Sequence, residues 1–480
     1  MATKKDLVEA YSFSRRRLVT AFVSGAPGGR EVEPARPGRM IVGGVALAVL
    51  LIAGAAVAGA LTDRPPADWD TPGLVTDDHG ALYVILEEDA VPGQPRLRQI
   101  INVTSAQLIL GAAVKTKSVP EDELNVQDKG APIGILDAPA TVPAAGQLIN
   151  SGWTSCTASG SGIKTEVTDR PGVTLTPGDG FVVRGADSGK PYLIAEAGVG
   201  PLRRAYSYEL PANNDGLYIA VGVSPTDVIT VPDEWLSLFP VGGPLNGAGL
   251  GIAGLGNSVD LPGYTAGARV GDYYFDSGRT LAATRNGFVL LSDFAAAVLR
   301  NTTLPGAGRK PVELKRSEGA GFNIDESADP YGDAAWPDDM LRGSAGANDQ
   351  ICAQLVTEED ELPRALLATV PSGSAMLEGV AEGEREVNVM SGRGALIRSA
   401  EWTTSRGGTT FLIDDRGRTN SVAGALEVER LGYQKVPAVV IPDSWNKLFQ
   451  PGADLSVLAA LCPPTTNAPT KADEDKNTCS

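Results

Sequence analysis

The chain has 480 residues and a formal net charge of −17, with a pI near 4.7. This acidic balance argues against nucleic acid as a partner, because nucleic-acid binding needs a clustered positive surface that displaces counterions from phosphate. The 57 glycines and 34 prolines, with only 6% aromatic residues, indicate many turns between short strands. We therefore expect a β-rich α+β fold.

The first predicted element is an uncharged apolar segment at 40–61, whose about 22 residues match the ~30 Å hydrocarbon core of a bilayer. A basic segment, 1–39, precedes it, and an acidic linker, 62–73, follows. By the positive-inside rule, 40–61 is a single transmembrane helix with a cytoplasmic N-terminus, and roughly 420 residues are exported. A cleaved signal peptide is the alternative, which the long preceding segment and the long apolar run disfavour.

A motif with the pattern [VI]-P-D-x-W-x-x-L-F occurs twice in the exported region, at 231–239 and at 441–449. Proline suits the start of a helix, and aspartate suits its first turn, where its charge meets the positive helix end. The Trp, Leu and Phe that follow are three and four residues apart, so they would share one buried face. The residues expected to carry this repeated structure are Pro232, Asp233, Trp235, Phe239, Pro442, Asp443, Trp445 and Phe449.

Apolar runs at 216–221 and 408–414 precede the two copies and are predicted strands. A weaker copy of the motif lies at 119–124, after a predicted strand at 81–86.

A predicted hairpin at 272–279 resembles 411–418, since both place Asp and Gly where the chain should turn. These elements together indicate four small α/β repeats at 74–140, 180–255, 265–310 and 395–461. The remaining segments, 141–180 and 311–394, would form a discontinuous central domain of an elongated exported region. The last stretch, 462–480, has almost nothing to bury and is a predicted disordered tail.

The four cysteines, Cys156, Cys352, Cys462 and Cys479, all lie on the predicted exported side, where disulfides persist. Four cysteines allow three pairings. A bridge between Cys156 and Cys352 would join the two halves of the central domain. Zinc binding is the competing interpretation, but no C-x-x-C spacing is present and His79 is the only histidine.

Two segments resemble nucleotide-binding loops only in part. The glycine run at 242–256 contains G-x-G-x-x-G, but no strand precedes it as the dinucleotide fingerprint requires, so we expect a flexible loop. The segment 184–191 has Arg184 where a phosphate loop needs glycine, and Pro191 where it needs Ser or Thr.

Other catalytic patterns are equally incomplete. No G-x-S-x-G motif is present, and His79 would be the only histidine base. The adjacent acids at 414–415 and 338–339 are typical of solvated turns rather than of a glycosidase pair. We therefore expect no catalytic residues, no cofactor and no metal.

The combination of a basic N-terminal segment with Ser-Arg-Arg-Arg at 14–17, one anchor, imperfect repeats and a cysteine early and late in a central domain resembles the EccB family. EccB proteins are membrane components of the actinobacterial type VII (ESX) secretion system. The resemblance implies an inner-membrane subunit whose bulk is extracytoplasmic, which self-associates and assembles with other Ecc proteins, including the motor ATPase EccC. It also implies a Cys156–Cys352 disulfide, whereas Cys462 and Cys479 have no assigned counterpart.

The family has been described as ATPase, but the incomplete phosphate loop does not support that activity here. Two alternatives to a structural subunit remain open. One is an anchored envelope hydrolase or ATPase, and the other is an anchored module that binds peptidoglycan.

Overall fold

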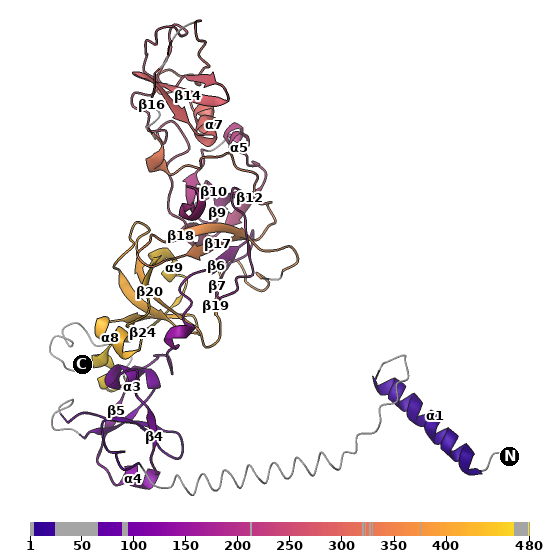
Figure 1. The fold of residues 1–480 in the computed structure, drawn as a ribbon, viewed down its shortest axis with the longest axis vertical. Helices are drawn as coiled ribbons and strands as arrows, with labels where there is room; N and C mark the ends of the chain where they lie inside the picture. Colours follow the sequence, from indigo (N-terminus) through magenta and orange to yellow (C-terminus); the bar gives the residue numbers. More distant parts are fainter. Residues whose placement is uncertain are drawn as a thin grey trace. The chain divides into compact units, whose positions relative to one another are not determined.

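The structure, a computed structural model, describes residues 4–24, 66–88, 95–211, 214–318, 321, 323–325, 328, 330–374, 376–464 and 479 (Figure 1). The chain divides into two compact units, Met1–Pro66 and Ala67–Ser480. In the first unit the structure describes one helix, α1 (Lys4–Ser24). The predicted transmembrane segment at 40–61 lies outside the described residues. None of the helices in the described ranges is both long and apolar enough to cross a membrane.

The described part of the second unit contains five small sheets, which confirms the β-rich α+β class. Four of the sheets share one topology. Three consecutive strands pair antiparallel, a short helix follows, the next segment pairs parallel with the first strand, and the last pairs parallel with the third. We refer to these four units as repeats 1 to 4, and to the fifth sheet as the central sheet.

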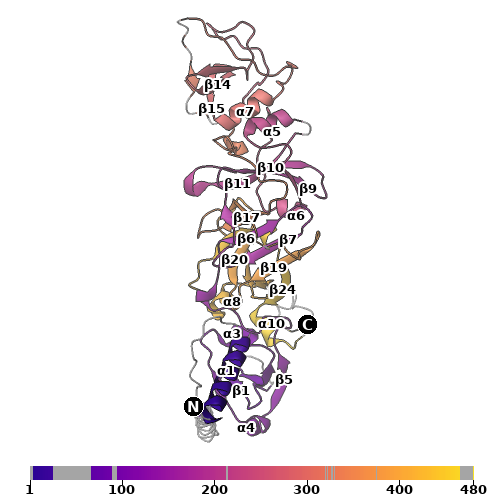
Figure 2. The ribbon, with the colours of Figure 1, turned by 90° about the vertical axis from the view of Figure 1, so that its right-hand side faces the viewer.

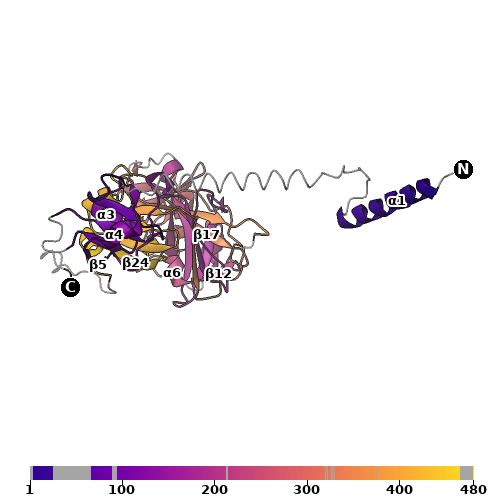
Figure 3. The same ribbon diagram turned by 90° about the horizontal axis from the view of Figure 1, so that it is seen from below.

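Repeats 1 and 4 have five strands each, in the orders β4-β1-β2-β3-β5 and β23-β20-β21-β22-β24. Repeat 1 consists of β1 (Gly73–Thr76), β2 (Leu82–Ile85), β3 (Leu97–Ile100), α3 (Val103–Leu110), β4 (Thr116–Ser118), α4 (Glu121–Asn125) and β5 (Lys129–Ile133), and Figure 3 shows α3, α4 and β5 together. Repeat 4 consists of β20 (Ala395–Ala400), β21 (Thr409–Ile413), β22 (Arg418–Val422), α8 (Ala425–Arg430), β23 (Val439–Pro442), α9 (Asp443–Asn446), β24 (Gln450–Leu455) and α10 (Val457–Leu461).

Repeats 2 and 3 have four strands each, and an isolated bridge stands for the fifth. Val241 bridges to Ser207 in repeat 2, and Glu313 bridges to Tyr273 in repeat 3. Repeat 2 consists of β9 (Gly180–Gly185), β10 (Pro191–Ala197), the 3-10 turn η2 (Gly200–Leu202), β11 (Arg204–Glu209), α5 (Asp215–Val221), β12 (Val228–Val231) and α6 (Asp233–Leu236). Repeat 3 consists of β13 (Tyr273–Asp276), β14 (Arg279–Thr284), β15 (Gly287–Leu291), α7 (Asp293–Asn301) and β16 (Ile324–Asp325).

The central sheet has six strands in the order β19-β7-β6-β17-β18-β8. Its strands come from two segments that repeats 2 and 3 separate in the sequence. The first segment, which also contains the 3-10 turn η1 (Ala145–Gln147), supplies β6 (Trp153–Thr157), β7 (Ile163–Val167) and β8 (Thr174–Leu175). The second, which follows the 3-10 turn η3 (Gly332–Ala334), supplies β17 (Ile351–Val356), β18 (Arg364–Thr369) and β19 (Arg385–Val389).

The helices pair the repeats. α5 of repeat 2 packs against α7 of repeat 3, as Figures 1 and 2 show, and their buried side chains belong to one hydrophobic cluster. α3 of repeat 1 packs against α8 and α10 of repeat 4. Each pair buries the apolar faces of helices that are too short to be stable alone.

The segment 216–221, which we predicted as a strand, forms helix α5 instead. The side chain of Asn214 caps the helix by accepting a hydrogen bond from the N–H of Leu217 at 3.3 Å. Gly222 ends it in the left-handed conformation, with φ of 94°. Leu217 and Val221 are buried whereas Ile219 is 67% exposed, which is the spacing of a helix rather than of a strand.

Repeat 3 extends beyond its predicted end at residue 310. Glu313 bridges to Tyr273, and β16 pairs with β15, so part of the segment 311–394 belongs to this repeat and not to the central sheet. The hairpin at 272–279 also differs from 411–418 in position. It joins the first and second strands of repeat 3, whereas 411–418 joins the second and third strands of repeat 4.

Candidate functional site: a core shared by the central sheet and two repeats

Repeats 2 and 4 each carry a four-residue helix directly after the strand that pairs with their first strand. These helices are α6 and α9, and Pro232 and Pro442 occupy their N-cap positions, with φ of −58° and −66°. Proline fixes φ near this value and has no N–H that the helix start would leave unpaired. The two copies of the motif therefore begin the same local structure.

The carboxylates of Asp233 and Asp443 connect these helices to the first hairpin of their own repeat. Asp233 accepts hydrogen bonds from the backbone N–H of Ser188 at 2.9 Å and from its hydroxyl at 3.2 Å. Asp443 accepts a hydrogen bond from the hydroxyl of Ser399. The segment 184–191, which resembles a phosphate loop, is therefore a β-hairpin whose turn is held by Asp233.

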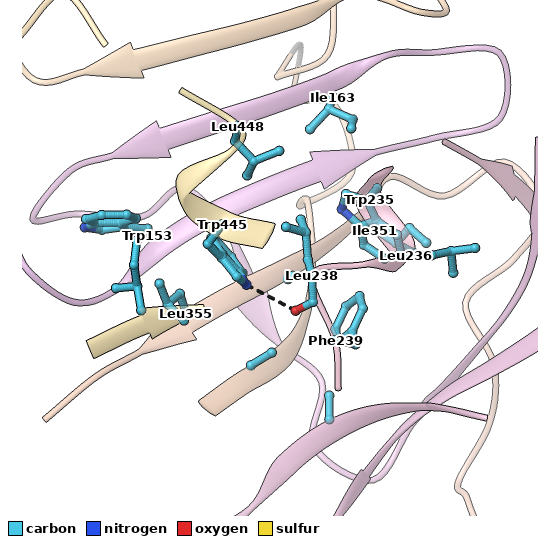
Figure 4. Close-up of a cluster of buried hydrophobic side chains, with 14 of the residues drawn as sticks. Trp153, Ile163, Trp235, Leu236, Leu238, Phe239, Ile351, Leu355, Trp445 and Leu448 are labelled. Atoms are coloured by element: carbon cyan, nitrogen blue, oxygen red, sulfur yellow. Dashed lines mark hydrogen bonds between the residues drawn. The ribbon is translucent and has the colours of Figure 1, made fainter. Parts of the chain in front are cut away.

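Trp235 and Trp445 are fully buried, with 0% of each residue exposed. Nε1 of Trp235 donates to the carbonyl oxygen of Ser155 in β6 at 3.0 Å. Nε1 of Trp445 donates to the carbonyl oxygen of Leu238 at 3.1 Å (Figure 4). A buried N–H without an acceptor would be costly, so these bonds fix the position of each ring. The first bond joins repeat 2 to the central sheet, and the second joins repeat 4 to the end of the repeat 2 motif.

The two tryptophans lie in a single hydrophobic core with residues of the central sheet (Figure 4). The rings of Trp235 and Phe239 pack edge to face with centroids 5.1 Å apart, and those of Trp153 and Phe449 with centroids 5.4 Å apart. Edge-to-face pairs add to the stabilisation from burial. The central sheet contributes Trp153, Ile163, Ile351 and Leu355 to this core.

Arg385 in β19 joins both motif helices at the surface. Its Nη1 donates to the carboxylate of Glu234 in α6 at 2.7 Å and to the carbonyl oxygen of Lys447, just after α9, at 3.0 Å. One guanidinium therefore contacts repeat 2 and repeat 4 at the same time.

Two disulfides are present. Cys156 and Cys352 are directly opposite each other in the paired strands β6 and β17, and both are fully buried. This bond connects the two segments that form the central sheet. Cys462 pairs with Cys479, and the carbonyl oxygen of Cys462 accepts the N–H of Gly134 in repeat 1 at 3.0 Å. Cys462 is thus buried against repeat 1, whereas most of the predicted tail lies outside the described residues.

A buried carboxylate lies where repeat 2 meets the central sheet. Glu196 in β10 accepts the backbone N–H of Leu367 in β18 at 2.9 Å and lies 3.4 Å from Arg203. Burial raises the pKa of Glu196, although the Leu367 hydrogen bond and the Arg203 charge oppose the increase. β8 is only two residues long, so Glu196 supplies the acceptor that a longer edge strand would provide.

The glycine run at 242–256 is a loop, but it packs closely against other backbone segments. A Cβ at Gly251 would lie 1.9 Å from the carbonyl oxygen of Pro330, and one at Gly256 would lie 2.0 Å from that of Pro305. Both glycines also have positive φ. We expected a flexible loop, whereas the structure requires glycine for close approach.

The remaining candidates from the sequence are the acidic pair 414–415 and His79, and each has polar partners in the structure. Asp414 is buried and accepts the backbone N–H groups of Arg416 and Arg418 at 3.0 and 2.9 Å, while Asp415 is exposed. Nδ1 of His79 lies 3.3 Å from Glu121. In the described ranges, no three His, Cys, Asp or Glu residues are arranged to hold a metal ion.

The arrangement of repeats around a disulfide-linked central sheet defines a scaffold-type protein in which one core joins distant parts of the chain. The chain belongs to the family described as "Type VII secretion system ESX-1, transport TM domain B", the EccB family, whose model matches residues 1–467.

Relatives in mycobacteria agree with this assignment. The ESX-3 secretion system ATPase EccB3 of Mycobacterium tuberculosis is 26% identical over 484 aligned positions, which cover 91% of this chain and 85% of that protein. The ESX-1 secretion system ATPase EccB1 of Mycolicibacterium smegmatis is 30% identical over 238 positions, and this match spans about half of each protein, 47% and 46%.

Solved structures have the same fold. A chain of an intact ESX-5 inner membrane complex matches with a TM-score of 0.58 at 19% identity, covering 98% of this chain and 97% of that chain. The EccB3 dimer from the ESX-3 core complex matches with a TM-score of 0.59 at 20% identity, covering 81% and 100%.

Three residues of the core region were not found from the sequence. Trp153 has no Pro-Asp before it. Arg385 has four other charged residues close to it in the sequence, at 378, 382, 384 and 386. Glu196 lies between two alanines, as a polar residue of an ordinary strand often does. The sequence of β6, Trp-Thr-Ser-Cys-Thr, gave no signal either, because three of its five residues are polar although all five are buried.

Proposed function

We propose that this protein is a structural subunit of a type VII secretion inner-membrane complex and that it forms extracytoplasmic parts of that complex. The carrying observation is the shared core, in which Trp235 and Trp445 join two repeats to one sheet whose halves are linked by a disulfide. This architecture suits a rigid body that presents surfaces to neighbours. In the proposed topology, the segment 40–61 anchors the chain with 1–39 in the cytoplasm.

The proposed partners are further copies of the same chain and the other Ecc membrane components, including the motor ATPase EccC. The relatives that were solved come from an inner membrane complex and from a dimer, which supports self-association as part of the proposal.

The test is native purification of the full chain from membranes through a tag after Ser480. We expect co-elution of a large complex that contains an EccC-type ATPase. A variant that lacks residues 1–39 but keeps 40–61 should yield less complex, with the exported repeats still folded and the Cys156–Cys352 bond still formed. Recovery of the full chain only as a monomer, in detergents that preserve other membrane complexes, would contradict the proposal.

The relatives carry the name ATPase, so hydrolysis is the second candidate function. Our proposal assigns none to this chain, because 184–191 is a hairpin held by Asp233 and Lys190 lies 3.2 Å from Glu209. We therefore expect no magnesium-dependent ATP hydrolysis above background from the purified chain, and the same background from Lys190→Gln. Hydrolysis that is lost in this variant, with Lys164→Gln as the unaffected control, would establish the enzymatic alternative.

A wall-binding module is the third candidate. Co-sedimentation of the purified chain with isolated peptidoglycan tests it directly, and saturable sedimentation of a monomer that forms no complex in membranes would favour it over assembly.

A further inference from the structure

A cavity of about 330 Å³ lies at the joint between the central sheet and repeat 4. Ligand sites typically begin near this size, so it has room for one small group. β19 and the turn before it form one wall, the β21–β22 turn forms the second, and the segment after α9 forms the third. The residues that line it include Gly383, Arg385, Val387, Arg416, Leu448 and Gln450.

Two arginines supply the hydrogen-bond donors of this cavity. Arg385 uses Nη1 for Glu234 and for the Lys447 carbonyl. Arg416 uses Nε and Nη2 for Asp414, and Nη2 also donates to the carbonyl oxygen of Asp137 at 3.5 Å. Within the described part of the chain, Nε and Nη2 of Arg385 and Nη1 of Arg416 make no hydrogen bond. Both side chains are about half exposed, at 47% and 48%.

The two acidic partners hold the guanidinium groups in place, so little side-chain freedom remains to be lost on binding. A guanidinium matches a carboxylate in shape and forms two parallel N–H···O bonds with it. The apolar side chains of Val387 and Leu448 lie beside these donors, and Gln450 adds an amide. The cavity therefore combines a site for one anionic group with a short apolar wall.

We propose that this cavity binds the C-terminal carboxylate of a peptide, with the last side chain of the peptide against Val387 and Leu448. The site does not depend on the assembly role proposed above. Two sources share this chemistry, the C-terminus of an exported protein and a wall peptide that ends in a D-amino acid.

The test measures binding to the purified full chain in detergent by isothermal titration calorimetry. The probes are N-acetyl-L-alanyl-L-alanine, its D,D isomer, the uncharged amide of the L,L form, and inorganic phosphate. We expect saturable binding of at least one dipeptide acid and at least tenfold weaker binding of the amide. Preference for the L,L form indicates a protein C-terminus, and preference for the D,D form indicates a wall peptide.

Variants locate the site. Arg416→Gln should weaken binding at least tenfold, and Gln450→Trp should do the same by filling the cavity while both arginines remain. Arg406→Gln is the control, because it removes a more exposed arginine, at 73%, that also pairs with an aspartate but lies outside the cavity, at Asp360. Circular dichroism of each variant checks the fold. Equal binding of acid and amide, dipeptide binding unchanged in both cavity variants, or binding of phosphate alone would overturn the proposal.

Discussion

Repeats 2 and 4 differ from repeats 1 and 3 in one element, although all four share a topology. In repeats 2 and 4, Pro and Asp start a helix whose tryptophan lies in the core of the central sheet. Repeat 1 has Pro120 and the acidic helix α4, with Leu124 buried in its own small cluster, and repeat 3 has no proline at the equivalent bridge. The shared sheet topology therefore defines a repeat. The helix that carries the tryptophan distinguishes the repeats that pack on the central sheet.

The largest expected effect comes from the bond inside the central sheet. Cys156→Ser with Cys352→Ser opens a loop with a sequence separation of 196 residues. The chain-entropy model assigns about 5 kcal/mol to a loop of this size. Chemical unfolding measures the loss. Removing Cys462–Cys479, with a separation of 17, should cost less, about 3 kcal/mol. Equal losses from both pairs would show that the central bond does not stabilise the sheet in this way.

Trp235→Ala and Trp445→Ala should each lower the free energy of unfolding by about 3–5 kcal/mol, since each leaves a cavity and an unpaired carbonyl in the shared core. Urea unfolding followed by circular dichroism gives the value. Trp402→Ala is the control, because Trp402 is only partly buried and lies at the edge of the same core, with the Arg204 guanidinium over its ring. If the control lost as much stability as the two motif variants, the core would not depend on the motif tryptophans.

Two buried carboxylates should give opposite pH dependences in different regions. The pKa of Glu196 is raised, so its contribution to stability is present below about pH 4.3, the unfolded pKa of glutamate, and is lost as pH rises through the folded pKa. Glu196→Gln should remove this slope from a plot of unfolding free energy against pH. Glu209→Gln, an exposed residue of the same sheet, should leave it. A slope that persists in Glu196→Gln excludes this carboxyl as its source.

Asp272 in repeat 3 should behave in the reverse way. Burial alone would raise its pKa, but hydrogen bonds from Arg309 and from two backbone N–H groups outweigh burial and hold the pKa below its usual value. Its contribution is therefore present above about pH 3.9 and is lost as pH falls through the folded pKa. Asp272→Asn should lower the free energy of unfolding at pH 7. The variant should then lose less stability than the parent protein when the pH falls from 7 to 3. Equal destabilisation at pH 7 and at pH 3 would contradict this sign.

The smallest effect is expected at the surface bridge. Arg385→Gln removes contacts to both motif helices, but the ion pair with Glu234 is partly exposed, so the loss should be about 0–1 kcal/mol. A double-mutant cycle with Glu234→Gln measures the pair. A coupling well above 1 kcal/mol would show that Arg385 holds repeats 2 and 4 together more strongly than a surface pair does.

The sequence predicted the repeats where rare residue types coincide. Pro, Asp and Trp at fixed spacing are informative because each has a separate physical reason to be there. The apolar run at 216–221 was not informative about helix or strand, because a buried helix and a buried strand are equally apolar over six residues. The deciding signals were Asn214 and Gly222, the residues that cap the helix at either end.

Contacts between distant segments were harder to predict. The bridge at Glu313 and the two-residue strand β16 leave almost no pattern in the sequence, so the end of repeat 3 was placed too early. The hydrogen bond from Trp445 to Leu238 and the cavity between β19 and repeat 4 depend on how separate units meet. No local propensity encodes such a meeting.

The position of β17 has a consequence for how the chain matures. While the chain is made from its N-terminus, β6 can pair only with β7 until residues 351–356 appear, and the backbone edge that β17 will cover stays open. During that interval the Cys156 thiol lacks Cys352, and Trp235 lacks the core residues that β17 supplies. Residues 441–449, which complete the core, come later still. The central core therefore stays open to proteases until these residues are made, and α3 of repeat 1 waits longer still for α10, against which it packs.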